Sequence, residues 1–131
     1  KEEIKMVNET KKIFSDPNLA VSATCVRVPV YTCHAESVNV ETMKPLSVDA
    51  LRALMSKSPG LTMIDDPAPT ADDPNRRTYP LSVELAGTDN VYVGRLRKDP
   101  SVECGYDMWV VADNLRKGAA LNAVQIAEFL F

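Results

Sequence analysis

The chain has 131 residues, 45% of them hydrophobic, which is enough for one domain with its own core. Fifteen basic and eighteen acidic residues give a formal net charge of −3 and a pI near 5.1, whereas non-specific nucleic-acid binders present a basic face. No apolar run reaches the roughly 18 residues that cross a bilayer, and the charged N-terminus has no signal-peptide pattern. We therefore expect neither nucleic acid nor membrane as a partner.

The three cysteines are Cys25, Cys33 and Cys104. They form no zinc-binding spacing, so we expect no metal site. An odd number of cysteines suits a reducing compartment. The expected location is therefore the cytoplasm, or the plastid if the source is a plant.

Residues 2–15 predict a helix with acidic residues at its start and lysines near its end, as the helix dipole favours. Glu2 and Lys5 lie three apart and so project side by side. The simplest interpretation of this pair is a solvated ion pair on the surface.

Residues 20–30 are largely β-branched or small and predict a strand in a mostly buried setting. Arg27 lies in its middle, and a buried arginine needs an anionic partner. That partner is either a structural carboxylate or a ligand carboxylate, which the planar guanidinium fits with two hydrogen bonds.

His34, the only histidine, lies just ahead of a second predicted strand, 36–42, in which Val38 and Val40 alternate with polar residues. In one straight strand Arg27 and His34 would lie ~23 Å apart on opposite faces. They serve one ligand only if the chain turns at residues 31–33. Otherwise His34 is a hydrogen-bonded structural residue.

Residues 43–112 predict one more helix and four short strands. Ser47 is the expected N-cap of helix 47–57, and the loop 65–80 contains four prolines. The predicted strands are 61–64, 81–85, 91–97 and 104–112. The short turns between the last three strands predict antiparallel pairing.

Asp113 or Asn114 is the expected cap of a helix that runs to the C-terminus. Past Gly118 this helix is apolar nearly all round, so it needs burial on more than one side. We therefore expect a partner surface that this sequence does not contain. Accordingly, we predict that residues 1–113 form the main domain. Residues 114–131 are predicted to form a helix that packs on this partner surface.

Three blocks resemble one family: EEIKMVNETKKI, RVPVYTCHAESVNVE and WVVADNLRKGAALNAVQIAE. They are similar to the C-terminal, catalytic and dimerisation portion of aspartate-β-semialdehyde dehydrogenase. The resemblance implies an α+β fold like the C-terminal domain of glyceraldehyde-3-phosphate dehydrogenase, with a mostly antiparallel sheet and helices on one face. It also implies a homodimer or tetramer.

Enzymes of this family interconvert aspartyl β-phosphate and aspartate β-semialdehyde with NADP and phosphate, a step toward lysine, threonine and methionine. The resemblance assigns general acid–base catalysis to His34. It assigns the substrate carboxylate to Arg27, a further substrate contact to Glu2 and phosphate to Lys5. Asn114 matches a position near the nicotinamide.

For that last role Asn122 is the alternative. Two family features are missing from the sequence: the nucleophilic cysteine in its expected place and the Gly-rich dinucleotide-binding unit. Cys-His-Ala around His34 also departs from the residues that members often carry. We therefore expect a piece of a larger enzyme that is inactive alone, with NADP bound mainly by a missing N-terminal domain.

Two other functions are compatible with these residues. The first is a non-catalytic dimerisation module with the same fold. The second is a small independent enzyme that uses Cys33 and His34, although adjacent residues in an extended chain point apart.

Overall fold

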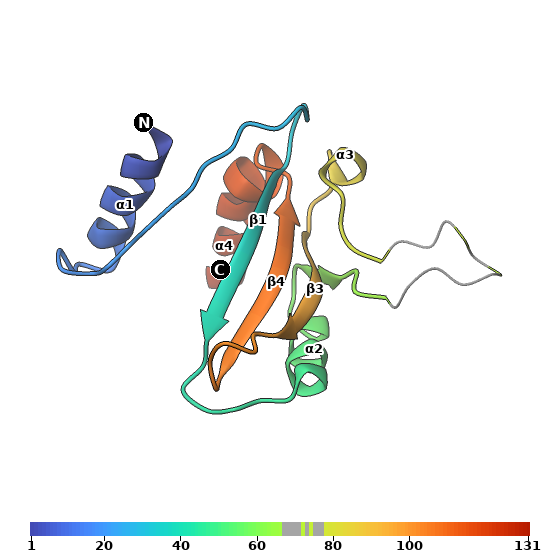
Figure 1. Cartoon of the computed structure of the whole chain (residues 1–131). Helices are drawn as coiled ribbons and strands as arrows, with labels where there is room; N and C mark the ends of the chain where they lie inside the picture. The colour runs from blue at the N-terminus through green and yellow to red at the C-terminus, as the bar shows by residue number, and fades with distance from the viewer. Residues whose placement is uncertain (67–71, 73, 75–77) are drawn as a thin grey trace.

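The computed structural model describes residues 1–66, 72, 74 and 78–131. Figure 1 shows a central sheet with helices around it and α1 standing to one side. The elements are α1 (Glu2–Ile13), β1 (His34–Glu41), α2 (Val48–Ser56), β2 (Leu61–Met63), α3 (Ser82–Leu85), β3 (Val91–Lys98), β4 (Gly105–Ala112), η1 (Arg116–Ala120), which is a π-helix, and α4 (Leu121–Leu130).

The four strands form one sheet in the order β1-β4-β3-β2. β4 pairs antiparallel with both β1 and β3, and only the short β2 runs parallel to its neighbour. This arrangement confirms the predicted α+β class with a mostly antiparallel sheet.

The core lies on both faces of β4. Tyr106 and Met108 face α2, together with Val38 and Val40 of β1. Val111 points the other way, because successive side chains of a strand alternate, and there it packs against Leu85 of α3. In this detail the fold differs from the expectation of helices on one face only.

Two predicted strands are wrong. Residues 20–30 are extended but unpaired, because a strand needs a neighbour for its backbone hydrogen bonds and the described chain offers them none. Residues 81–85 contain the single helical turn α3 instead, since five residues are too few for periodicity to separate strand from helix.

The other predicted elements are confirmed within one or two residues at each end. Ser47 caps α2 as expected, and its Oγ accepts a hydrogen bond from the Ala50 amide at 3.1 Å. The predicted loop 65–80 lies largely outside the described residues.

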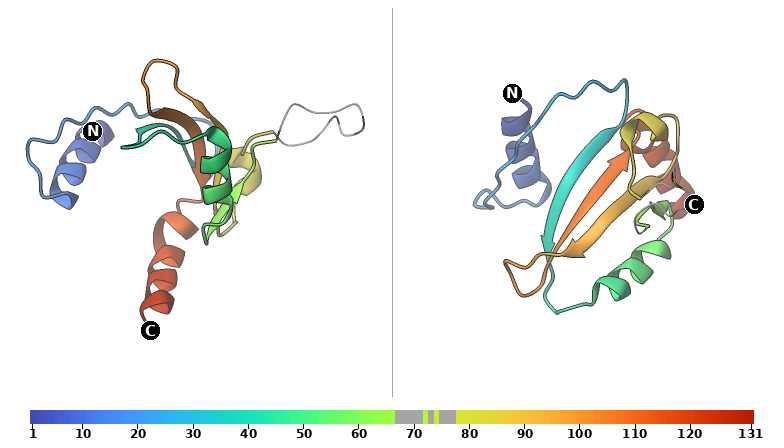
Figure 2. Two further views of the ribbon diagram at one scale, coloured as in Figure 1. Left: turned by 90° about the horizontal axis from the view of Figure 1, so that it is seen from below. Right: turned by 45° about the vertical axis from the view of Figure 1, so that its right-hand side comes forward.

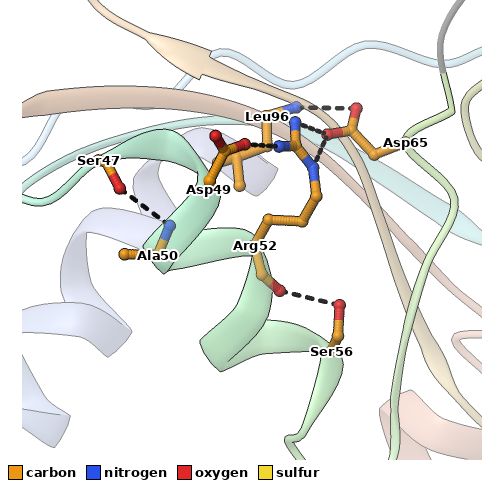
Figure 3. A network of polar contacts seen from close by, with 7 residues as sticks. All are labelled: Ser47, Asp49, Ala50, Arg52, Ser56, Asp65 and Leu96. Carbon is orange, nitrogen blue, oxygen red and sulfur yellow. Dashed lines mark hydrogen bonds and ion pairs between the residues drawn. The ribbon is translucent and has the colours of Figure 1, made fainter.

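Arg52 of α2 ties that helix to the sheet (Figure 3). Its Nε and one terminal nitrogen donate to Asp65 Oδ2 at 3.1 and 2.7 Å, and its other terminal nitrogen donates to Asp49 Oδ1 at 2.8 Å. Asp65 Oδ1 also accepts from the Leu96 amide at 3.2 Å. Asp65 therefore links α2 to β3 through one carboxylate.

The two ends of the chain have few contacts with the sheet. No residue of α1 or α4 is buried, and α4 leads away from the sheet toward the C-terminus (Figure 2). Among the described residues, no helix has both the length and the apolar character needed to cross a membrane.

The two aspartates on Arg52 offer a matched pair for a stability test. The Asp65 side chain is 10% exposed and the Asp49 side chain 93% exposed. We expect Asp65→Ala to lower the free energy of unfolding by about 1.5–3 kcal/mol, because it strands a charged donor and a backbone amide. Asp49→Ala should cost less than about 0.5 kcal/mol. Urea denaturation measures both, and equal losses would contradict the assigned role of Asp65.

Candidate functional site

His34 is the first residue of β1, and it pairs with Ala112, the last residue of β4. Its imidazole is exposed at the end of the sheet where the chain continues into the last helix. Within the described part of the chain, the side chain has no hydrogen-bond or ion-pair partner. The structure therefore leaves the imidazole available and does not support a hydrogen-bonded structural role.

The backbone turns sharply just before His34. Cys33 has a φ of 76°, in the left-handed region that costs a residue with a Cβ about 1–2 kcal/mol. Its side chain is only 6% exposed and packs with Val111 and Leu85. Its amide donates to Asn114 Oδ1 at 2.8 Å. Packing and this hydrogen bond together hold the turn.

Asp113 fixes the chain next to that hydrogen bond. Its side chain is buried, and its Oδ2 accepts from the Gly87 amide at 2.7 Å. Its Oδ1 accepts from the amides of Leu115 and Arg116 at 2.8 and 3.1 Å. Asp113 is thus the residue that receives the first free amides of the last helix, and Asn114 turns back toward β1.

These hydrogen bonds lower the pKa of Asp113, with the Gly87 amide as the largest cause and the amides of Leu115 and Arg116 as further ones, although burial acts in the opposite direction. The carboxylate is therefore held ionised in the folded state.

Arg27 differs from its sequence-based expectation. It is exposed on the extended segment rather than buried in a strand, because no strand among the described residues pairs with that segment. In the described residues its guanidinium has no carboxylate partner, so the alternative of a structural ion pair does not hold. The reversal of the chain before β1, which a shared site requires, is present (Figure 1). No hydrogen bond joins Arg27 to His34, and their convergence on one ligand stays a prediction.

Glu2 and Lys5 belong to α1, a helix that stands away from the sheet (Figure 2). Their carboxylate and ammonium are 3.9 Å apart and both more than half exposed, which is the solvated pair expected from their spacing. Two contacts of Cys25 hold α1 to the following segment. Its amide donates to Glu3 Oε1 at 3.0 Å, and its Sγ lies 3.4 Å from the Met6 sulfur.

Cys33 is poorly suited to act as a nucleophile. Burial raises the pKa of its thiol, and the negative charge of Asp113 raises it further. Since the thiolate is the reactive form, a raised pKa lowers reactivity at neutral pH. The independent Cys33–His34 enzyme is therefore disfavoured. Within the described residues, no three His, Cys, Asp or Glu side chains gather closely enough to hold a metal ion.

Comparison with known families decides the assignment. The family described as "Semialdehyde dehydrogenase, dimerisation domain" matches residues 1–117. The chain belongs to this family.

Semialdehyde dehydrogenase relatives match nearly the whole chain. An aspartate-semialdehyde dehydrogenase from Aquifex aeolicus is 51% identical over 130 residues, and one from Legionella pneumophila is 50% identical over 131 residues. Each match covers 99% of this chain and 36% of the relative. The resemblance to the C-terminal portion of aspartate-β-semialdehyde dehydrogenase is confirmed, and the chain spans about a third of the length of these relatives.

Solved structures agree with the fold. The crystal structure described as aspartate semialdehyde dehydrogenase II of Vibrio cholerae complexed with ASA has a TM-score of 0.76 at 49% identity, over 99% of this chain and 36% of that one. An aspartate semialdehyde dehydrogenase from Francisella tularensis, 23% identical, has a TM-score of 0.73 and supports the fold alone.

Sequence reasoning missed one feature of this candidate site. It named Asn114 but did not connect it to Cys33, which lies 81 residues earlier. The available signal was the pair Asp113-Asn114 between a strand and a helix, where one residue is enough for capping. With Asp113 as the cap, the Asn114 side chain is then free to make a hydrogen bond to another part of the chain.

The thiols test the assignment of Cys33. We expect iodoacetamide at neutral pH to modify exposed Cys25 at least about 10-fold faster than buried Cys33. Peptide mass spectrometry over a time course distinguishes the two sites. Modification of Cys33 ahead of Cys25 would contradict the burial described above and restore the Cys33–His34 enzyme as a candidate.

The lowered pKa of Asp113 predicts a pH dependence of stability. A carboxyl whose pKa is lower in the folded state stabilises the fold above its unfolded pKa, and this contribution is lost as the pH falls through the folded value. We therefore expect wild-type stability to decline below about pH 4 more steeply than that of Asp113→Asn.

Urea midpoints between pH 6 and pH 2 measure this difference. Asp99, whose pKa is lowered mainly by hydrogen bonds from Ser101, contributes with the same sign in both proteins, so the comparison isolates Asp113. Parallel curves for the two proteins would contradict the assignment.

Proposed function

We propose that the chain is the catalytic and dimerisation part of an NADP-dependent aspartate-semialdehyde dehydrogenase. The reaction interconverts aspartyl β-phosphate and aspartate β-semialdehyde, in the cytoplasmic route to lysine, threonine and methionine. The observation that carries the proposal is His34, an exposed imidazole without a partner in the described chain, held at the end of the sheet by the turn at Cys33.

His34 is the proposed general acid–base. Imidazole gives and takes protons near neutral pH, which suits a reaction in which a carbonyl group is attacked and re-formed. Its position at a strand end, next to a turn held by packing, keeps its backbone in one place. This is the rigidity that proton transfer within hydrogen-bond reach requires.

Arg27 is the proposed clamp for the substrate carboxylate. Its guanidinium is exposed and, within the described residues, unpaired, so it is free to bind two oxygens of an anion. Lys5 is proposed to bind phosphate and Glu2 to contact substrate. These last two roles require that the complete enzyme hold α1 near His34, because α1 contacts the sheet little in this chain.

The fit to NADP rests on Asn114. Its Oδ1 accepts the Cys33 amide, which leaves Nδ2 available to donate to the carboxamide oxygen of a nicotinamide. When bound, the cofactor would supply or accept the hydride of the reaction. The sequence contains no Gly-rich dinucleotide loop, and we assign the rest of the cofactor to a nucleotide-binding domain outside the chain.

The exposed apolar surface of the last helix supports the proposal of a separate nucleotide-binding domain. In this chain no residue of α4 is buried, and its large apolar side chains Val124, Ile126, Phe129 and Leu130 are open to solvent. Large exposed apolar surfaces mark interaction sites. We propose that residues 114–131 pack on the nucleotide-binding domain, and that residues 1–113 contribute to the homodimer or tetramer.

The alternative function is a non-catalytic dimerisation module. The matching family is described as a dimerisation domain, which favours it. The two functions differ in one respect, which is whether the imidazole of His34 takes part in chemistry.

A hybrid enzyme separates the two functions. It joins the part of the Legionella pneumophila relative that this chain does not cover to residues 1–131, and it is assayed by NADPH formation from aspartate β-semialdehyde and phosphate. We expect the hybrid to be active and the chain alone to be inactive. His34→Gln should lower kcat of the hybrid by about 10²–10⁴-fold, because glutamine keeps the polarity but transfers no proton.

Thermal unfolding of both hybrids controls for folding. A dimeric, folded hybrid in which His34→Gln keeps wild-type kcat would overturn the catalytic proposal in favour of the module. An inactive wild-type hybrid would have the same consequence.

A further inference from the structure

A side-chain hydrogen bond joins Cys33, the residue before β1, to Asn114, which precedes the last helix. Asn114 Oδ1 accepts the Cys33 amide at 2.8 Å. Because the backbone amide is a donor, the atom of Asn114 that faces it must be the carbonyl oxygen. The side chain thus has one defined orientation.

This hydrogen bond acts on Cys33, the joint between two segments with proposed functional residues. His34 is fixed on one side of the joint by pairing with Ala112. On the other side, residues 20–32 carry Arg27 and have no place in the sheet. Rotation about φ of Cys33 therefore changes where Arg27 lies relative to His34.

The backbone conformation of Cys33 is unfavourable on its own. Cys33 is in the left-handed region, where a residue with a Cβ is disfavoured, so the conformation persists only while its surroundings impose it. Burial of the Cys33 side chain limits the motion of the Cβ. The Asn114 bond fixes the amide, and with it the preceding peptide.

We propose that Asn114 is a positioning residue: by holding the Cys33 amide, it sets the angle between the Arg27 segment and the His34 strand. This inference rests on the proposed roles of Arg27 and His34. It assigns to Asn114 a function within the chain in addition to the cofactor contact, and the two are compatible because they use opposite ends of one amide.

Asp113 holds the backbone around Asn114 in place. Its carboxylate accepts hydrogen bonds from the backbone amides of Gly87, Leu115 and Arg116, and these fix the backbone on both sides of Asn114. The Asn114 side chain therefore starts from a fixed Cα, as a positioning role requires.

The test on the chain itself uses three variants. Asn114→Leu keeps the size and removes the acceptor, and Asn114→Asp keeps an acceptor oxygen. Asn90→Leu is the matched control, because Asn90 is also half-buried and also makes one side-chain hydrogen bond, to Thr62 Oγ1 at 2.9 Å.

Two NMR signals report on the joint. When Cys33 has a left-handed backbone, its amide and α protons are close and give a strong intraresidue nuclear Overhauser cross peak. The hydrogen-bonded amide proton also exchanges slowly with solvent. A third signal, the His34 ring, is unambiguous because the chain has one histidine. We expect Asn114→Leu to speed Cys33 amide exchange by about 10-fold or more, weaken the cross peak and shift the ring signal. Asn114→Asp and Asn90→Leu should keep all three.

Wild-type values of these signals in Asn114→Leu would overturn the proposal. If Asn114→Leu does not fold, the unsubstituted chain decides: a slow Cys33 amide with a strong cross peak supports the proposal, and a fast amide with a weak cross peak overturns it.

The hybrid enzyme gives the kinetic readout. We expect Asn114→Leu to lower kcat by about 10–100-fold, because reacting groups are displaced. Asn114→Asp should recover part of this loss, because it keeps the acceptor of the Cys33 amide but loses the donor proposed for the nicotinamide, and Asn90→Leu should show no loss. Equal losses in the Leu and Asp variants would overturn the positioning role. If the unsubstituted hybrid is inactive, the proposed function has failed, while the NMR signals still decide whether Asn114 holds the turn.

Discussion

A hydrogen bond between the Cys33 amide and the Asn114 side chain connects two regions 81 residues apart, and the geometry of the proposed site depends on it. The left-handed backbone of Cys33 is unfavourable on its own. It is maintained because Asn114 holds its amide, the core holds its thiol, and Asp113 holds the backbone of Asn114. Three ordinary interactions thus place one exposed imidazole.

The molecule is unevenly constrained around that point. After His34 in the sequence, the chain is well held: the strands are paired, the hydroxyl of buried Tyr106 hydrogen-bonds to both the amide and the carbonyl of Leu46, and Arg52 ties α2 to the sheet. Before His34 in the sequence, α1 and the extended segment that follows it have few contacts with the sheet. The backbone of His34, the proposed acid–base, is therefore held within this chain. By contrast, the residues proposed to bind substrate and phosphate lie on segments with few contacts to the sheet.

Much of this was predictable from local patterns. Alternation in β1, the cap at Ser47 and short turns predicted most of the sheet and α2 correctly, because those features act over a few residues. The strand at 20–30 was predicted wrongly, since β-branched composition reports a preference while pairing needs a partner. The left-handed Cys33 carries no sequence signal, because only glycine, asparagine and aspartate adopt that region often enough to indicate it. Its bond to Asn114 is a tertiary contact that spacing does not reveal.

Arg27 and His34 are proposed to act on one substrate molecule. A crystal structure of the hybrid enzyme with aspartate β-semialdehyde tests this arrangement. We expect the Arg27 guanidinium to bind the substrate carboxylate while the His34 imidazole lies within hydrogen-bond reach of the reacting carbonyl group. Side chains that point away from each other, with the substrate bound by neither or by only one of them, would contradict it.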